Sequence, residues 1–308
     1  MSKTPTLSVL MPVYNGATYL AQAIESIQAQ TVSDFEFIIV NDGSTDRTLE
    51  ILWQFAKADG RIKILSRPNT GIVGALNDGL AVCRAEFVAR MDADDLALAT
   101  RFAQQLAAMK QDPQCIALGG AALFTDPEGR PLKIYRPTLT HASIEDELAR
   151  GNGGALIHPT VLFRRDALTA CGGYRERYNY IEDLDLYVRL LERGRLANLP
   201  EVLLHYRQHP HSINHVQGNR TQQTAEIIAP LREKKGLDPW TLPPEPSSKP
   251  AGIADFRRQW ALDAAQNENY DSAWANALQA VRLAPFQKIN WSCLRYIHGL
   301  RCAAKKPA

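Results

Sequence analysis

The chain has 308 residues, of which 45% are hydrophobic and 22% charged, and its formal net charge is +2. This composition is typical of a globular protein with one large domain and an appendage, and the small net charge gives no reason to expect a nucleic-acid partner. Five cysteines without a C-x-x-C pair argue against a disulfide framework or a zinc site. The apolar run before Pro12 is too short for a signal peptide, and no stretch approaches the roughly 20 apolar residues of a membrane-spanning helix. We therefore expect a cytoplasmic protein.

Apolar runs alternate with amphipathic stretches along the first part of the chain. The runs predict short strands over residues 7–11, 35–40, 62–65 and 86–91. Apolar spacing predicts helices over residues 17–30, 45–58 and 72–83. Strands that alternate with helices predict an α/β fold, in which helices cover a parallel or mixed sheet.

Polar residues follow each of the four predicted strands. In chain order they are Pro12, Tyr14 and Asn15, then Asp42 and Gly43, then Asn69 and Gly71, and finally Asp92, Asp94 and Asp95. Ligands of such sheets bind at the carboxyl ends of the strands, so these residues predict a nucleotide-type site at one edge. The chain lacks both G-x-G-x-x-G after the first strand and a G-K-[ST] loop, which argues against dinucleotide-binding dehydrogenases and P-loop enzymes.

The acidic cluster Asp92, Asp94 and Asp95 comes directly after the fourth predicted strand. Like charges at a strand end favour a bound cation, and Mg²⁺ or Mn²⁺ prefers oxygen ligands. The alternative is a solvated acidic loop, in which Asp94 or Asp95 caps the following helix. Three histidines between residues 205 and 211 surround Arg207, and His209 is a further candidate metal ligand. An ordinary basic loop explains that segment equally well.

The second half is predicted to contain a helix over residues 99–110, strands over 115–124 and 196–206, and less regular structure over 131–165. A further helix is expected over residues 180–193. On a helical wheel, Glu182 and Asp185 lie on its polar side and Asp183 falls among apolar residues. A carboxylate on a buried face needs a partner or a function, which makes Asp183 a candidate catalytic group. The alternative is that Asp183 stabilises the first helical turn.

The C-terminal part differs in composition from the rest of the chain. Six prolines between residues 230 and 250 predict a linker, and residues 251–308 are predicted to form two or three helices. Ala273, Ala277, Ala280 and Val281 form an alanine face like that of a tetratricopeptide hairpin. No acidic residue follows Asp271, so this basic, aromatic segment is a candidate for contact with an anionic membrane surface. A terminal helix packed on its neighbour is the alternative.

Residues 7–215 resemble the family 2 glycosyltransferases, which have a GT-A fold. The resemblance lies in the segments LSVLMPVYNG, FEFIIVNDGSTDRT, RPNTGIVGALNDGL, FVARMDADD, HPTVLFRRDAL, GGYRERYNYIEDLDLYVRL and HYRQHPHSI. It implies that Tyr14 and Asp42 hold the nucleotide base and that Asp92 and Asp94 meet the ribose and the metal–diphosphate. It also implies that Asp183 of the Glu182-Asp183 pair is the catalytic base.

The resemblance further implies a metal-dependent, inverting enzyme that transfers one sugar at a time, because Q-x-x-R-W and membrane spans are absent. The expected donor is a nucleotide-sugar, with UDP-sugars as first choice. The expected acceptor is a glycan or a lipid-linked molecule, at the inner membrane face, in surface polysaccharide or glycolipid assembly. The expected division is a nucleotide-sugar half (1–120), an acceptor and catalytic half (121–229), a linker (230–250) and a helical segment (251–308). The alternatives are a nucleotide-sugar nucleotidyltransferase and a non-catalytic scaffold.

Overall fold

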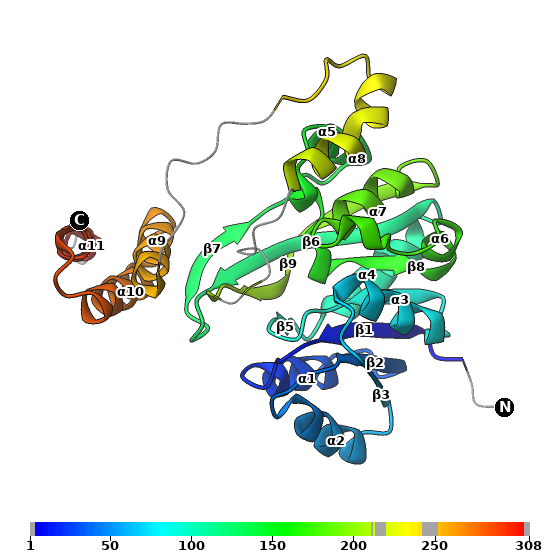
Figure 1. Ribbon diagram of the computed structural model, residues 1–308, viewed down its shortest axis with the longest axis horizontal. Helices are drawn as coiled ribbons and strands as arrows, with labels where there is room; N and C mark the ends of the chain where they lie inside the picture. Colours follow the sequence, from blue (N-terminus) through cyan, green and yellow to red (C-terminus); the bar gives the residue numbers. More distant parts are fainter. Residues whose placement is uncertain (1–3, 211, 213–219, 242–251, 305–308) are drawn as a thin grey trace. The chain divides into compact units, whose positions relative to one another are not determined.

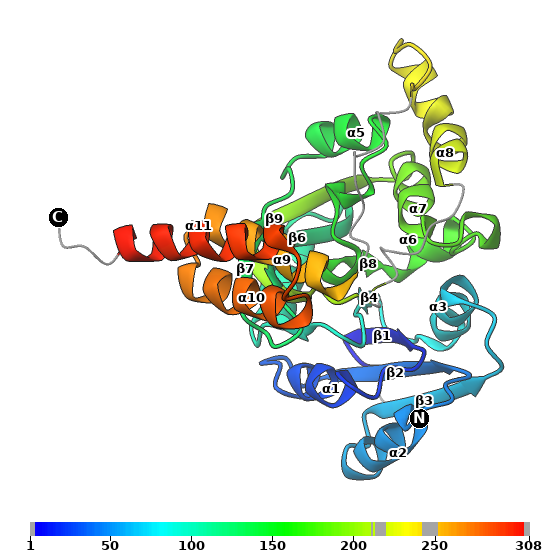
Figure 2. The same cartoon turned by 60° about the vertical axis from the view of Figure 1, so that its left-hand side comes forward.

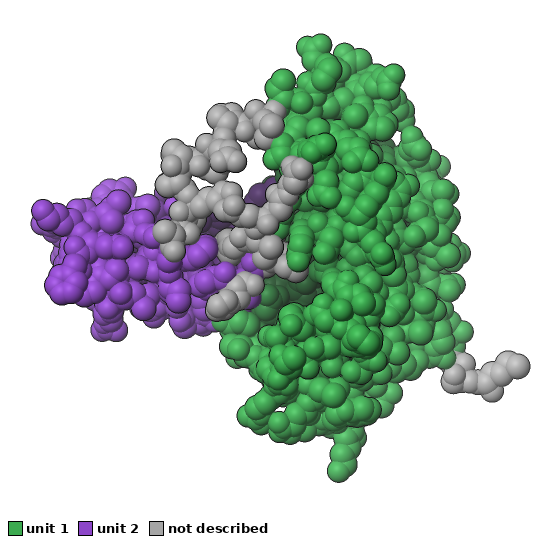
Figure 3. All heavy atoms as spheres, viewed as in Figure 1, with its two compact units in different colours: residues 1–122, 136–204, 217–242 green, residues 123–135, 205–216, 243–308 purple. Residues whose placement is uncertain are grey.

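The computed structural model describes residues 4–210, 212, 220–241 and 252–304. They form two compact units, coloured separately in Figure 3. The first unit comprises residues 1–122, 136–204 and 217–242, and the second comprises residues 123–135, 205–216 and 243–308. The second unit therefore combines the C-terminal helices with two short pieces of the preceding chain.

Four parallel strands organise the first unit, as the alternating pattern predicts (Figure 1). They are β1 (Leu7–Val13), β2 (Phe35–Asp42), β3 (Ile62–Arg67) and β4 (Phe87–Arg90). Strand β1 pairs with β2 on one side and β4 on the other, and β3 pairs with β2. Every residue of β1, β2 and β4 is buried, which explains why these strands read as continuous apolar runs.

The sheet continues with antiparallel pairing and is therefore mixed. Strand β8 (Leu162–Arg164) runs antiparallel to both β4 and β6 (Cys115–Thr125). The complete order is β3-β2-β1-β4-β8-β6-β9-β5, with β7 paired to β6. The remaining strands are β5 (Leu96–Ala97), β7 (Pro131–Tyr135) and β9 (Arg195–Arg207). The predicted α/β fold with a mixed sheet is confirmed.

Helices cover both faces of the parallel strands. Helices α1 (Leu20–Gln28) and α2 (Thr48–Ala58) lie on one face, and α3 (Ile72–Val82) lies on the other (Figures 1 and 2). The first two helices begin three residues later than predicted, because the residues before them form loop contacts. The Gly16 N–H donates to Thr48 Oγ1 at 2.9 Å, and the Ala17 N–H donates to Asp46 Oδ2 at 3.1 Å.

Shorter helices complete the first unit. The α-helices are α4 (Arg101–Gln111), α5 (His141–Ala149), α6 (Arg165–Ala170), α7 (Glu182–Leu190) and α8 (Arg220–Lys234), and the 3₁₀ turns are η1 (Gly153–Ala155), η2 (His158–Thr160) and η3 (Glu176–Tyr178). Helix α8 contains Pro230, the residue at which the linker was predicted to begin. It contributes Ile227, Ile228 and Leu231 to the core, so the first unit extends beyond the predicted boundary.

A charged cluster stabilises the edge of the sheet where the parallel strands begin. The buried Glu36 accepts hydrogen bonds from Ser8 Oγ at 2.7 Å, Lys63 Nζ at 2.6 Å and Arg84 Nε at 2.9 Å. Burial alone raises the pKa of Glu36, but these donors together lower it from 4.5 to about 2. The folded state therefore holds the ionised carboxylate more tightly than the unfolded chain does.

We expect Glu36→Gln to reduce the free energy of unfolding by about 2–3 kcal/mol at pH 7. Because folding lowers the pKa of Glu36, the contribution of its charge is complete above pH 5. This contribution is lost as the pH falls through 4.5 toward 2. The difference in the free energy of unfolding between wild type and Glu36→Gln should therefore become smaller at low pH. Urea unfolding at several pH values measures this, with the exposed Glu25→Gln as control. An equal difference in unfolding free energy at pH 7 and pH 3 would contradict the stabilising role of the Glu36 charge.

The second unit is built around three helices, α9 (Ile253–Gln266), α10 (Tyr270–Leu283) and α11 (Lys288–Ala304). The predicted alanine face of α10 is buried and packs with Ala261 and Ala264 of α9. Arg257 joins the helices to the β6–β7 hairpin through two hydrogen bonds of 2.6 Å to the Glu128 carboxylate. None of the helices in the described residues has both the length and the apolar character that crossing a membrane requires.

Candidate functional site

The loops after β1 and β2 are joined at the edge where both strands end. The Asn15 N–H donates to Ser44 Oγ at 2.9 Å, and Asn15 Oδ1 accepts from the Thr45 N–H at 2.8 Å. Asn15 has a φ of 49°, a left-handed conformation that asparagine tolerates better than most residues. Pro12 is buried within β1, whereas Tyr14 directly after the strand is 53% exposed. Tyr14 therefore presents an aromatic ring at this edge.

Asp42 connects the end of β2 to the loop before α3. Its buried carboxylate accepts hydrogen bonds from the Thr70 N–H at 3.2 Å and the Gly71 N–H at 2.9 Å. Arg67 Nε lies 3.4 Å from the same carboxylate, and Arg67 Nη1 contacts Asp78 at 2.8 Å. A carboxylate has about four acceptor sites, so Asp42 can order this loop and still accept from a ligand. The sequence analysis missed Arg67, although it is the last residue of β3.

Two glycines allow the backbones of these loops to approach each other. Gly43 has a φ of 73°, and a Cβ there would lie 2.6 Å from the backbone nitrogen of Asn69. Gly71 has a φ of 91° and immediately precedes α3. Any side chain at Gly43 would push Asn69 away, so this close approach requires glycine. Together with the hydrogen bonds of Asp42, it brings four predicted strand-end residues into one loop cluster: Asp42, Gly43, Asn69 and Gly71.

The acidic residues after β4 form a possible cation site. One carboxylate oxygen from each of Asp92, Asp94 and Asp95 can be chosen so that all three lie within 4.8 Å of one another. Asp92 and Asp94 are half-buried, and Asp95 is 1% exposed. Three oxygen donors suit Mg²⁺ or Mn²⁺, so the residues fit the ion that the acidic cluster predicts. The structure brings all three acids of the predicted cluster together, including Asp95, to which the family resemblance assigns no role.

Two buried arginines lie beside this acidic cluster. Arg90 Nη1 contacts Asp92, and Arg101 Nη2 donates to the backbone oxygen of Arg90 at 2.8 Å. Burial lowers the pKa of Arg101 to about 9, against the opposing charge of Asp95, so Arg101 still carries a positive charge near neutral pH. Burial also opposes the charge of Arg90, but the nearby carboxylate of Asp92 outweighs it and the pKa of Arg90 is raised. These charges partly offset the repulsion among the acids.

The helical-wheel prediction for Glu182 is wrong. Glu182 is 5% exposed, and its Oε2 has no hydrogen-bond partner among the described residues. Asp185, placed on the same polar side, is 3% exposed and forms an ion pair of 2.6 Å with Arg189. A wheel assumes that a helix packs on one face only, but α8 packs against α7 as well. Asp185 therefore faces α8, whereas Glu182 is close enough to the end of β4 for the charges of Arg90 and Asp92 to act on it.

Glu182 and Asp183 are adjacent carboxyl groups with perturbed acidity. Burial, with a smaller contribution from the charge of Asp183, raises the pKa of Glu182 to about 7. Burial also raises the pKa of Asp183, whereas a hydrogen bond from the Leu184 N–H and the charge of Arg90 act in the opposite direction. Asp183 is half-buried, and its carboxylate lies near Gly153 of η1. Raised pKa values near neutrality are common among general acids and bases.

A buried aromatic cluster surrounds this carboxyl pair. His158 Nε2 lies 3.0 Å from the hydroxyl of Tyr174, and the ring of Tyr187 meets the His158 ring edge-on. Burial, aided by the charge of Arg90, lowers the pKa of His158, so this histidine is neutral near pH 7. Tyr180, just before α7, has a φ of 72°, a strained value that often marks a functional segment. The sequence analysis gave no role to His158 or Tyr174.

The family model described as "Glycosyl transferase family 2" matches residues 8–172, more than half of the chain. The chain belongs to glycosyl transferase family 2. The amylovoran biosynthesis glycosyltransferase AmsE of Erwinia amylovora is 32% identical over 215 residues, covering 68% of this chain and 79% of AmsE. The O-antigen biosynthesis glycosyltransferase WbnJ of Escherichia coli is 33% identical over 207 residues, covering 66% of this chain and 80% of WbnJ. This chain is therefore a glycosyltransferase.

Solved structures show the same fold. TarS 1–349 of S. aureus, in complex with UDP-GlcNAc, aligns with a TM-score of 0.59 at 15% identity, covering 98% of this chain and 93% of that chain. The mannosyltransferase PcManGT of Pyrobaculum calidifontis, in complex with GDP-Man and Mn²⁺, aligns with a TM-score of 0.55 at 16% identity. That alignment covers 98% of this chain and 87% of PcManGT. At these identities the likeness concerns the fold alone, which is the predicted GT-A type.

His209, the third predicted metal ligand of this glycosyltransferase, belongs to the second unit. Its backbone N–H donates to Ser212 Oγ at 3.3 Å, which closes a short turn. His211 lies outside the described residues. The assignment of His209 as a ligand stays a prediction, because this turn does not bear on it.

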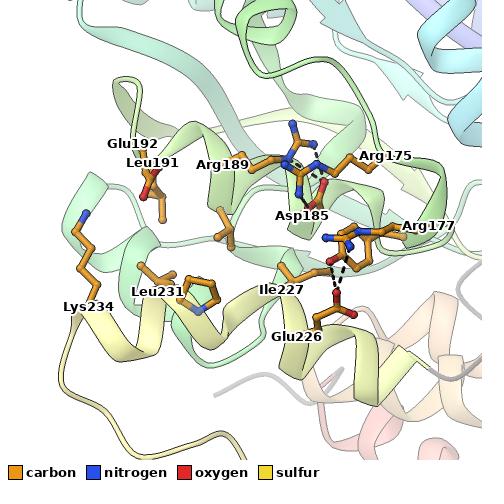
Figure 4. A pocket seen from close by; sticks show the side chains of 13 residues that line it. Arg175, Arg177, Asp185, Arg189, Leu191, Glu192, Glu226, Ile227, Leu231 and Lys234 are labelled. Atoms are coloured by element: carbon orange, nitrogen blue, oxygen red, sulfur yellow. Dashed lines mark hydrogen bonds and ion pairs between the residues drawn. The ribbon is translucent and has the colours of Figure 1, made fainter.

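A cavity of about 390 Å³ lies between α7 and α8 of the glycosyltransferase (Figure 4). Its apolar lining includes Val188, Ile227 and Leu231, and Arg177 pairs with Glu226 across it at 3.4 Å. None of the predicted site residues lines this cavity. It is therefore not part of the predicted donor site.

Proposed function

We propose that the protein is a metal-dependent, inverting glycosyltransferase that moves one sugar from a nucleotide-diphospho-sugar to an acceptor hydroxyl. The observation that carries the proposal is the electrostatic coupling between the strand-end acids and the carboxyl pair of α7. The charges of both Arg90 and Asp92 act on the pKa of Glu182. Coulomb interactions weaken with distance, so this coupling supports a reacting centre between Asp92 and the Glu182–Asp183 pair.

The relatives support the class of substrate. AmsE and WbnJ are named for the biosynthesis of surface polysaccharides, so we propose that this enzyme acts in surface polysaccharide or glycolipid assembly. TarS and PcManGT were solved with UDP-GlcNAc and with GDP-Man and Mn²⁺, which supports a nucleotide-sugar donor and a divalent ion here. A UDP-sugar remains the first choice of donor. The acceptor is a glycan or a lipid-linked molecule at the cytoplasmic face of the inner membrane.

The residues of the strand-end edge bind the donor. Tyr14 provides an exposed ring that stacks on the nucleotide base, and Asp42 accepts a hydrogen bond from the base. Asp92 and Asp94, together with Asp95, would hold the cation. When bound, the ion offsets the negative charge that develops on the leaving nucleoside diphosphate.

The chemical step requires one general base in this proposal. Asp183 accepts the proton of the acceptor hydroxyl while that oxygen attacks the anomeric carbon and the bond to the diphosphate breaks. One displacement inverts the configuration at the anomeric carbon, so no carboxylate is needed as a nucleophile. The buried Arg90 stabilises the carboxylate of Asp92 on one side of the reacting centre and the carboxyl groups of Glu182 and Asp183 on the other.

Incubation with a panel of UDP-, GDP- and dTDP-sugars, Mn²⁺ or Mg²⁺, and simple alkyl glycosides as acceptors tests the proposal. Metal-dependent release of a nucleoside diphosphate, together with a product of inverted anomeric configuration, is the expected result. A nucleotidyltransferase would instead form or consume pyrophosphate, and a non-catalytic scaffold would bind a donor without turnover. A retained configuration in the product would disprove the single-displacement mechanism.

A further inference from the structure

The turn between α10 and α11 carries an exposed apolar group, which we call the apolar tip. It consists of Leu283, Phe286, Ile289 and Trp291, which are 54%, 98%, 57% and 45% exposed. All four lie within nine residues of sequence around one turn of the second unit (Figure 2). Single exposed apolar residues are common on soluble proteins, but a local group of four large ones indicates an interaction surface.

The turn is held in place by buried polar contacts. Asn290 is fully buried, and its Nδ2 donates to the backbone oxygens of Ala280 at 3.1 Å and Ala284 at 3.3 Å. Arg258 Nη1 donates to Asn290 Oδ1 at 2.8 Å, and Trp291 Nε1 donates to the backbone oxygen of Pro285 at 2.8 Å. The exposure of Phe286 therefore belongs to a fixed turn rather than to a loose chain end.

Basic side chains surround the apolar tip. Arg282, Lys288 and Arg295 are exposed, and none of them forms an ion pair with another described residue. The acids of these helices are paired elsewhere, Asp255 with Arg258 at 2.7 Å and Asp271 with Arg301 at 2.7 Å, and no acidic residue follows Asp271 in the sequence. Apolar side chains beside unpaired cations fit a surface that offers both hydrocarbon and negative charge.

We propose that the apolar tip inserts into the headgroup region of an anionic lipid membrane, with Arg282, Lys288 and Arg295 contacting the lipid phosphates. A protein partner would need a preformed pocket of matching shape, whereas a bilayer accepts any amphipathic surface of this kind. The insertion gives the enzyme a peripheral membrane contact without a spanning helix. It is independent of the proposed reaction, because the tip lies in the second unit and carries none of the proposed catalytic residues.

The test uses the full chain and vesicles of either phosphatidylcholine or an equal mixture of phosphatidylcholine and phosphatidylglycerol. We expect cosedimentation with the mixed vesicles, weaker binding to the neutral ones, and loss of binding as the salt concentration rises. Phe286→Ser should lower the partition coefficient about tenfold, because one fully exposed ring no longer enters the lipid. Lys288→Glu should lower it on the order of tenfold, because it reverses one surface charge.

Trp53→Ser is the matched control, since Trp53 of α2 is an exposed aromatic residue of the first unit, 60% exposed. It should leave vesicle binding unchanged, and all three variants should keep the wild-type melting curve and nucleoside diphosphate release with a soluble acceptor. Absence of binding to the mixed vesicles, or equal binding by Phe286→Ser and wild type, overturns the proposal. So does a dimer that Phe286→Ser dissociates without any vesicle binding, because the tip would then be an interface between two copies.

Discussion

Asp183→Asn is expected to reduce kcat by about 10²–10⁴-fold, the usual contribution of a positioned general base. The amide keeps the size and shape of the carboxylate but does not accept the acceptor proton. The donor KM should change little, because the proposed donor contacts come from the ends of β1 to β4 and not from α7. Steady-state kinetics with the best donor of the panel measures both constants.

Glu182→Gln is the decisive comparison, because the structure shows Glu182 to be buried beside Asp183 rather than solvated. If Asp183 is the base, Glu182→Gln should reduce kcat less than Asp183→Asn does, since Glu182 then acts only through its charge and packing. A larger loss from Glu182→Gln would assign the base to Glu182. Asp166→Asn, at a side chain 92% exposed, is the surface control and should match wild type.

Asp94→Ala is expected to weaken donor binding in the presence of Mn²⁺ by about a hundredfold or more. Loss of an outer-shell partner alone commonly costs 10–100-fold in metal affinity, and a direct ligand should cost at least as much. Because Asp94 is half-buried and lies outside the apolar core, the circular dichroism spectrum should remain native. Calorimetric titration with Mn²⁺ alone and with the donor separates metal binding from turnover.

The variant Asp95→Asn extends this experiment to the third acid of the cluster, to which the family resemblance assigns no role. It should also weaken Mn²⁺ binding, whereas Asp166→Ala should not. Unchanged donor affinity of Asp94→Ala with metal present would exclude the metal role of the acidic cluster while leaving the assignment of Asp183 open.

The sequence by itself determined where the first four strands lie along the chain and the edge of the sheet at which the polar residues gather. Strands buried on both faces must be continuously apolar, so β1, β2 and β4 are visible as short runs that end at polar residues. Parallel strands bring their carboxyl ends to one edge, which is why Asp42 and Gly71 could be expected together before any contact was known. The alanine face of α10 could also be predicted from the sequence, because its spacing matches the period of a helix.

Only the tertiary structure decided which carboxylates are buried. Glu182 and Asp185 looked solvent-facing because a wheel describes one helix. In the fold Asp185 faces α8, and the charges of Arg90 and Asp92 from the end of β4 act on Glu182. The roles of Arg67 and Arg90 could not be predicted for the same reason. Arg67 contacts Asp42 of a neighbouring strand, and the charge of Arg90 acts on Glu182 of a distant helix. The apolar tip also required the structure, because exposure of Phe286 follows from the helix packing around its turn. Local periodicity encodes which face of an element can be buried, whereas contacts between distant segments decide what buries it and which charges meet there.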